Sequence, residues 1–139
     1  MLLRVVPAVV VLGCALAVAP AASAKTVNGG GDNDVLTGTK NADVIRGYAG
    51  GDKLYGKAGP DRLEGGRDND TLYGGRGNDL LLPGKGGDTI DAGPGNDTIK
   101  LVRDGIQDLV LCGPGKDKLY VKGRDPGDVF FDCETIVYQ

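Results

Sequence analysis

The sequence lacks histidine and tryptophan, and its 139 residues include only two phenylalanines and five tyrosines. Without histidine there is no imidazole to activate a nucleophile, and zinc and copper lose one of their preferred ligands. The chain also carries no nucleophile elbow and no zinc motif. So few large side chains would make only a thin core in a compact fold. The composition therefore disfavours an enzyme and an ordinary globular packing.

Long apolar runs are also scarce, and the one clear example is Val5 to Ala19. A membrane anchor is disfavoured because this run falls short of the roughly 20 residues that a spanning helix needs. Arg4 precedes the run and Ala22-Ser23-Ala24 follows it, which predicts a signal peptide over residues 1–24, cut after Ala24. The alternative rests on Val11 to Cys14, which resembles a bacterial lipobox and would leave Cys14 lipidated.

The exported chain has few cysteines and no excess of positive charge. Removal of Arg4 would leave 15 basic and 19 acidic side chains, a formal net charge of −4. There is no basic patch of the size that nucleic-acid binding needs. Cleavage would leave two cysteines, Cys112 and Cys133, and an even pair in an exported protein predicts a disulfide. Two free thiols are the alternative.

What the sequence does contain is a repeat. Residues 29–100 divide without gaps into eight nonapeptides, such as GGRDNDTLY (65–73) and GGRGNDLLL (74–82). Self-similarity at a short fixed period indicates a repeat architecture. The sixth position is always aspartate: Asp34, Asp43, Asp52, Asp61, Asp70, Asp79, Asp88 and Asp97. The eighth is always leucine or isoleucine: Leu36, Ile45, Leu54, Leu63, Leu72, Leu81, Ile90 and Ile99.

Each nonapeptide combines a turn with a short strand. Its first six residues are mostly turn formers, and its last three are strand-like around the aliphatic residue. The fourth position holds only Asp, Asn or Gly, the residues that tolerate positive φ, which predicts one left-handed residue at that place. Strands of three residues are stable only when copies stack on one another.

If each coil consists of two nonapeptides, equivalent positions recur at every second repeat. Leu36, Leu54, Leu72 and Ile90 then form one inward column, and the remaining eighth-position residues form the other. Tyr55 and Tyr73, which are also two repeats apart, should stack outside. The expected fold is an all-β, right-handed parallel β-roll, a solenoid with a thin aliphatic filling.

The aspartates would form two ladders, one at each edge of the flattened coil. Adjacent coils are about 4.8 Å apart, so like charges would repel one another unless a cation lies between them. Calcium fits best because it takes six to eight oxygen ligands in flexible geometry, whereas magnesium prefers fewer protein ligands. The alternative is a set of metal-free Asx-turns, but neutral asparagine would make the same turns without repulsion.

The repeat resembles the repeat-in-toxin (RTX, haemolysin-type) calcium-binding nonapeptide GGxGxDxUx, where U is a large aliphatic residue. GGRGNDLLL matches it most closely, whereas GTKNADVIR and GKAGPDRLE have only one glycine in the first two places. The resemblance implies calcium ions between successive coils, held by the sixth-position aspartates of both coils and by turn carbonyls. About six sites follow: 34 with 52, 52 with 70, 70 with 88, 43 with 61, 61 with 79, and 79 with 97.

The period lengthens after Lys100. Leu101-Val102 and Val121-Lys122 are insertions, so that the spacings from Ile90 to Val110 and from Ile99 to Leu119 exceed two nonapeptides. The unit CGPGKDKLY adds Asp117 to the predicted calcium ligands, while Ile106 argues against ligation through Asp108. Residues 25–28 would be a lead-in, and residues 101–139 degenerate repeats with a disulfide-clamped C-terminal cap. This tail resembles the ends of exported actinobacterial members of the family.

The functional prediction is a secreted calcium-binding module, structural or interacting in role, that folds when calcium binds. The partner, a protein or a glycan, stays open, and a monomer is expected. The main alternative is a surface or matrix adhesion protein that binds carbohydrate or protein through its outer β face. An enzyme or a toxin fragment has less support, since the period accounts for nearly every aspartate.

Overall fold

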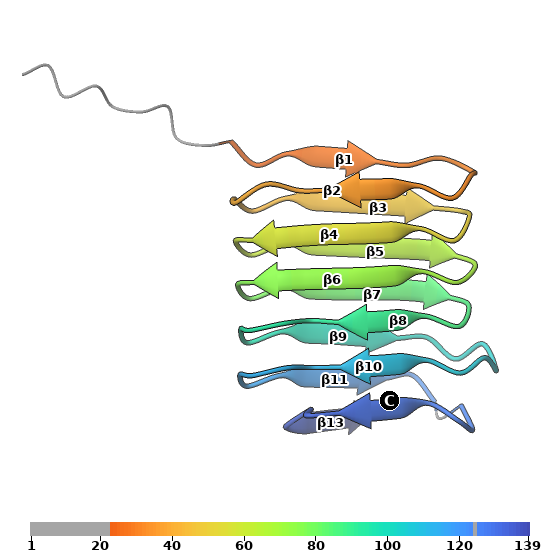
Figure 1. Cartoon of the computed structure of the whole chain (residues 1–139). Helices are drawn as coiled ribbons and strands as arrows, with labels where there is room; N and C mark the ends of the chain where they lie inside the picture. Colours follow the sequence, from red (N-terminus) through yellow and green to blue (C-terminus); the bar gives the residue numbers. More distant parts are fainter. Residues whose placement is uncertain (1–22, 124) are drawn as a thin grey trace, which may run out of the picture.

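The computed structural model describes residues 23–123 and 125–139, which form a parallel β-solenoid with two strands in each coil (Figure 1). The predicted signal peptide and Cys14 lie outside the described residues, except for Ser23 and Ala24. The strands are β1 (Thr26–Asn28), β2 (Val35–Thr37), β3 (Val44–Tyr48), β4 (Lys53–Ala58), β5 (Arg62–Arg67), β6 (Thr71–Arg76), β7 (Leu80–Lys85), β8 (Thr89–Asp91), β9 (Thr98–Leu101), β10 (Leu109–Leu111), β11 (Lys118–Val121), β12 (Val129–Phe131) and β13 (Thr135–Tyr138).

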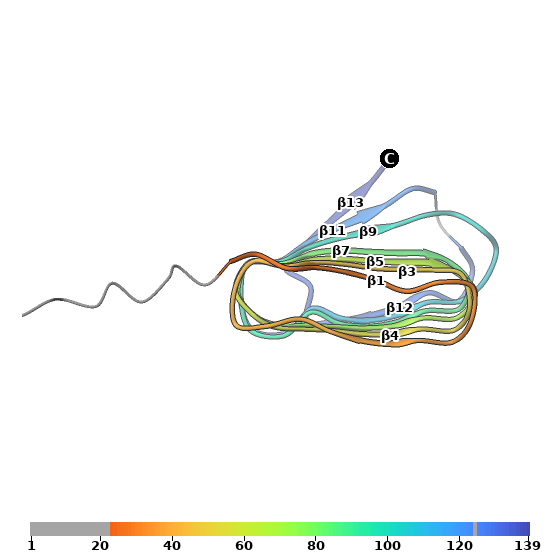
Figure 2. The same ribbon diagram turned by 90° about the horizontal axis from the view of Figure 1, so that it is seen from above.

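Odd- and even-numbered strands form two separate parallel sheets on the two sides of a flattened coil (Figure 2). The register follows the repeat, because Leu54 pairs with Leu72, the equivalent residue two nonapeptides further on. Beyond β8 the step lengthens by the inserted residues, as in the pairing of Ile90 with Val110. The predicted β-roll with two nonapeptides per coil, and its longer C-terminal period, are therefore confirmed.

The eighth-position residues fill the narrow space between the sheets. From Ile45 to Ile99 each of them is fully buried, and Leu36, in the first coil, keeps 8% exposure. Val110 and Leu119 extend the two columns into the longer coils. On the outer face the rings of Tyr55 and Tyr73 stack with centroids 4.8 Å apart. The predicted columns and the tyrosine stack are confirmed.

The strands in the middle of the solenoid are longer than the three residues expected. β4 to β7 have six residues each, because the ladder continues into the first residues of the next nonapeptide, as in the pairing of Lys57 with Gly75. Glycines recur at the first and second positions of the nonapeptide and let the main chains of adjacent coils approach closely. Strands of three residues, as predicted, are β1, β2, β8, β10 and β12.

The turns contain two left-handed positions, not one. The fourth position has positive φ in five of the eight nonapeptides, including Gly50, Gly59 and Asp68. The second position has positive φ in six, including Tyr48 and Lys57, which have side chains. Two left-handed residues separated by one other residue reverse the chain sharply, so the second position is as much a part of the turn as the fourth.

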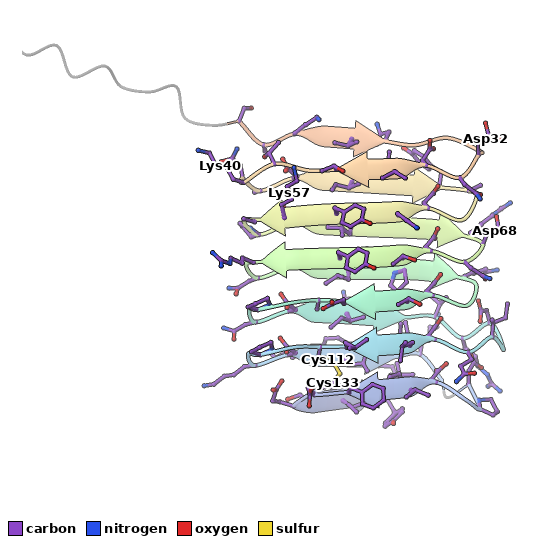
Figure 3. The ribbon with its side chains drawn as sticks, viewed as in Figure 1. Asp32, Lys40, Lys57, Asp68, Cys112 and Cys133 are labelled. Carbon is purple, nitrogen blue, oxygen red and sulfur yellow. A yellow bond between two sulfur atoms is a disulfide. The ribbon has the colours of Figure 1, made fainter. Side chains whose placement is uncertain are left out.

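The C-terminal segment continues the solenoid and does not fold across its end. β12 pairs with β10 and β13 with β11, each adding one strand to its sheet. Phe131 and Tyr138 stay more than half exposed, whereas Phe130 and Cys133 pack against the core. The segment predicted to be a cap therefore takes the form of one more coil. A disulfide joins Cys112 to Cys133 in the neighbouring coil (Figure 3).

Candidate metal centre

The sixth-position aspartates immediately precede the strands, at the two edges of the flattened coil. Those from Asp43 to Asp97 are at most 3% exposed, and Asp117 is fully buried. Asp34, in the first coil, is half-buried. Their position follows from the repeat. The turn ends at the sixth residue, the strand begins at the seventh, and the inward-facing aliphatic residue is the eighth. The sequence thus places a column of carboxylates inside each edge.

A hydrogen-bond ladder connects the carboxylates of adjacent coils. The main-chain N–H of Asp52 donates to Oδ1 of Asp70 at 2.8 Å, and the N–H of Asp70 donates to Oδ1 of Asp88. The same bond recurs along both edges, from Asp34, Asp43, Asp61, Asp79, Asp88 and Asp97 to the aspartate one coil further on. One oxygen of each carboxylate is therefore used to join coils.

The other carboxylate oxygen has no such role. In the described part of the chain, Oδ2 is buried without a hydrogen-bond partner in Asp52, Asp61, Asp70, Asp79, Asp88, Asp97 and Asp117. Leaving a buried polar atom unpaired costs about 1–3 kcal/mol, and more when the group is charged. Seven such atoms in register form a set of donors that a cation at each level would satisfy.

A cradle of main-chain atoms surrounds these oxygens at the first position of the repeat. A Cβ atom on Gly65 would lie 2.4 Å from Oδ2 of Asp70 and 2.3 Å from the carbonyl oxygen of Pro83 in the next coil. Gly56 stands in the same relation to Asp61 and to the carbonyl oxygen of Gly74. The unpaired oxygen and a carbonyl oxygen from the following coil thus face the same small space.

Replacing Gly65 with alanine tests this cradle. The added methyl group would overlap two oxygens, so we expect a loss of stability of about 1–3 kcal/mol, as for other overpacked sites. Chemical denaturation of the folded protein measures it. Gly31→Ala is the matched control, because nothing lies within 4 Å of a Cβ atom there. Equal stability of the two variants would contradict the geometry of the cradle.

Burial of the carboxylates changes their acidity. Burial raises the pKa of Asp61 and Asp70 to about 6 and that of Asp88 and Asp97 to about 7, and the charges of neighbouring aspartates add to this rise. Ionising these carboxylates in the fold therefore costs free energy unless a positive charge compensates them. The repulsion expected from the sequence acts together with this loss of hydration.

The first coil differs from the rest. Oδ2 of Asp34 accepts the N–H of Gly30 at 2.8 Å, and Oδ2 of Asp43 accepts the N–H and the hydroxyl of Thr39. Burial would raise the pKa of Asp43, but the hydrogen bonds from Thr39 and Lys25 outweigh it and lower that pKa. In these two carboxylates, the second oxygen accepts hydrogen bonds from residues of the preceding turn.

The ladder extends beyond the predicted site residues. The N–H of Asp108 donates to Oδ1 of Asp128 at 3.0 Å, and the N–H of Asp117 donates to Oε2 of Glu134 at 2.8 Å. Asp108 is buried, but its Oδ2 is not among the unpaired atoms. Glu134 occupies the place of a sixth-position aspartate, which the sequence reading missed because the last unit no longer matches the repeat.

A second ladder of asparagines was also missed. Oδ1 of Asn69 accepts the N–H of Gly87 in the next coil at 2.8 Å, and the same bond recurs at Asn33, Asn78 and Asn96. This ladder runs opposite to that of the aspartates, since here the later coil donates. The recurring Asn-Asp pair at positions five and six was the signal that could have revealed it.

The donor set fits a hard cation that takes both carboxylate and main-chain carbonyl oxygens. Within residues 23–123 and 125–139, no three His, Cys, Asp or Glu side chains gather closely enough to hold an ion by themselves. Each level offers carboxylates from two adjacent coils together with turn carbonyls. Calcium accepts such mixed oxygen ligands in flexible geometry. The fold and the donor set together define the class of β-roll repeat proteins whose turn oxygens fit a hard cation such as calcium.

The comparison with protein families agrees with this class. The model of the RTX calcium-binding nonapeptide repeat (4 copies) matches residues 28–63, 46–81, 55–90 and 82–100, more than half of the chain. The chain belongs to this family and is a calcium-binding repeat protein. A comparison with curated proteins gave no match. No helix in the described part of the chain is long and apolar enough to cross a membrane.

Proposed function

We propose that calcium ions bind between successive coils, with the sixth-position aspartates of both coils as ligands. Six sites lie within the regular repeat, between residues 34 and 52, 52 and 70, 70 and 88, 43 and 61, 61 and 79, and 79 and 97. A seventh lies between residues 97 and 117. When bound, calcium supplies the positive charge that the ladders lack.

The observation that carries this proposal is the set of unpaired Oδ2 atoms. Each belongs to the later aspartate of one proposed pair, and the seven atoms correspond to the seven proposed sites. The first-coil residues Asp34 and Asp43 act only as the earlier partners, consistent with their satisfied Oδ2 atoms. Asp108 belongs to none of the seven proposed pairs.

Counting the ions tests the assignment. Native mass spectrometry of the calcium-saturated protein should give about seven bound ions, and Asp117→Asn should lower the count by one. Asp128→Asn is the control, because this half-exposed residue lies beyond the proposed sites. A count well below six, or one that Asp117→Asn leaves unchanged, would contradict the proposed set.

The pH dependence of the calcium-free protein follows from the raised pKa values. An unfolded aspartate titrates near 3.9, whereas Asp88 and Asp97 titrate at about 7 in the fold. The folded state therefore binds more protons between about pH 4 and pH 7, and its stability falls as pH rises through this window. We expect strand content without calcium to increase as pH is lowered from 8 to 5.

Circular dichroism of metal-free protein measures this trend. The calcium-saturated protein should behave in the opposite way, because protons compete with calcium for the same carboxylates. A calcium-free strand signal that declines or stays flat between pH 8 and pH 5 would argue against buried, uncompensated aspartates.

We further propose that the protein is exported and acts as a structural or interaction module outside the cytoplasm. The predicted signal peptide over residues 1–24 supports export. The disulfide between Cys112 and Cys133 supports it as well, because such bonds persist mainly in oxidising compartments. Intact mass of the secreted product tests the proposal: a chain beginning at Lys25 is expected, and a lipidated Cys14 would overturn it.

A further inference from the structure

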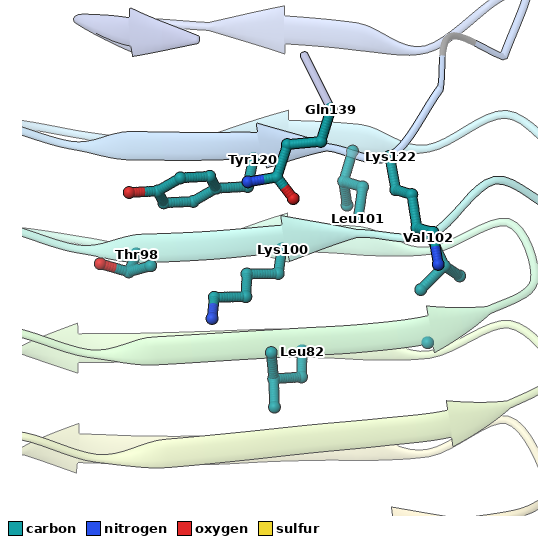
Figure 4. A pocket seen from close by; sticks show the side chains of 9 residues that line it. Leu82, Thr98, Lys100, Leu101, Val102, Tyr120, Lys122 and Gln139 are labelled. Atoms are coloured by element: carbon teal, nitrogen blue, oxygen red, sulfur yellow. The ribbon is translucent and has the colours of Figure 1, made fainter. Parts of the chain in front are cut away.

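The outer face of the odd-numbered sheet opens into a groove where the period lengthens. β5 and β7 stay paired as far as Arg67 and Lys85, but β7 and β9 pair only through Leu80 with Thr98 and Leu81 with Ile99. Beyond that point the strands separate, and Figure 2 shows β9, β11 and β13 fanning outward from the rest of the sheet. The separation leaves a groove of about 640 Å³ (Figure 4).

The groove combines an apolar surface with positive charge. Leu82, Val102 and the ring of Tyr120 line it, together with Lys100, Lys122 and Gln139, and the core residue Leu101 forms part of its floor with only 3% exposure. Nζ of Lys100 lies 5.9 Å from the centroid of the Tyr120 ring. Such a volume falls within the range of about 300–1,000 Å³ typical of small-molecule sites. An apolar body can therefore lie close to a cation here.

Among the described residues, the strands that border the groove carry no acidic side chain. The sequences of β7, β9, β11 and β13 contain no Asp and no Glu, whereas they carry Lys85, Lys100 and Lys118. Among the described residues, neither Lys100 nor Lys122 takes part in an ion pair. Further along the same face, by contrast, Glu64 pairs with Arg46 and Arg62. The groove is therefore bordered by two lysines, Lys100 and Lys122, that have no acidic partner among the described residues.

We propose that this groove binds a medium-chain carboxylate. The alkyl chain lies along Leu82, Val102 and the ring of Tyr120, and the carboxylate meets the ammonium groups of Lys100 and Lys122. A chain without charge would leave both lysines uncompensated, and a cationic amphiphile would be repelled. The site is formed by the two-residue insertion at Leu101-Val102, so the regular nonapeptide repeat has no equivalent of it.

Amide chemical shifts of the calcium-saturated protein, titrated with octanoate, test the proposal. Shifts should concentrate at residues 82, 100–102 and 120–122, and affinity should rise about fourfold for each methylene added from hexanoate to octanoate to decanoate. Octanol and octylammonium, of the same chain length, should bind more weakly. Binding of octylammonium as tight as that of octanoate, or shifts spread over the whole surface, would overturn the proposal.

Two variants separate the groove from general surface attraction. Lys100→Gln and Lys122→Gln should each weaken octanoate binding by about two- to fivefold, the usual range for a solvent-exposed charge pair. Lys53→Gln, on the exposed face of β4 in the other sheet, should leave it unchanged. The same loss in all three variants would contradict a specific site, while leaving the assignment of calcium untouched.

Discussion

Replacing Asp70 with asparagine is expected to remove two of the bound calcium ions while helping the calcium-free chain to fold. Asp70 belongs to two proposed sites, with Asp52 and with Asp88. The substitution removes a charge-assisted contact of about 1.5–3 kcal/mol at each, which corresponds to about 10- to 100-fold weaker binding. An amide oxygen still accepts the N–H of Asp52, so the ladder itself is retained.

The opposite effect without calcium follows from the same carboxylate. Burial and the charges of Asp52 and Asp68 raise the pKa of Asp70 to about 6, so the ionised form destabilises the calcium-free fold at neutral pH. Asparagine carries no such charge. Calorimetric titration measures calcium binding, and circular dichroism measures the strand content of the calcium-free protein. Asp91→Asn, on the outer face of β8, is the control. A variant that loses strand content under both conditions would contradict this role.

Truncating a side chain of the aliphatic filling should lower the stability of the fold strongly. Leu81 is fully buried in β7, and truncation of such a side chain to alanine costs about 2–5 kcal/mol. The neighbouring Leu82 points outward and is half-buried. Leu82→Ala should therefore cost clearly less, although both variants remove the same atoms.

Denaturation of the two leucine variants in saturating calcium measures the difference. Because the filling is one side chain thick in each column, the cavity left at Leu81 has no second layer that could move in to fill it. Equal losses for Leu81→Ala and Leu82→Ala would mean that the two faces of β7 are not inside and outside as the register requires.

The repeat made much of the fold predictable from sequence. A fixed aliphatic residue every nine positions determines which side of each strand faces inward, so the pairing of Leu54 with Leu72 and of Ile90 with Val110 followed directly. The identity of the cation followed from residue chemistry, since the aspartates recur at one position and histidine is absent.

Other features depended on contacts that a pattern does not contain. Tyr48 and Lys57 adopt positive φ at the second position, where their side chains gave no reason to expect it. Bulky residues near the end, such as Phe131, predicted a cap, but the pattern did not predict that β12 would pair with β10 as one more strand. Glu134 joined the ladder through its place in space, without the nonapeptide pattern around it.

The central claim is that the aspartate ladders require calcium, so that calcium is part of the fold. Circular dichroism of the protein at neutral pH, first with a chelator and then with millimolar calcium, tests it most directly. We expect little strand signal with the chelator and a cooperative gain of strand content as calcium is added. A full strand signal that is the same with and without calcium would contradict the claim.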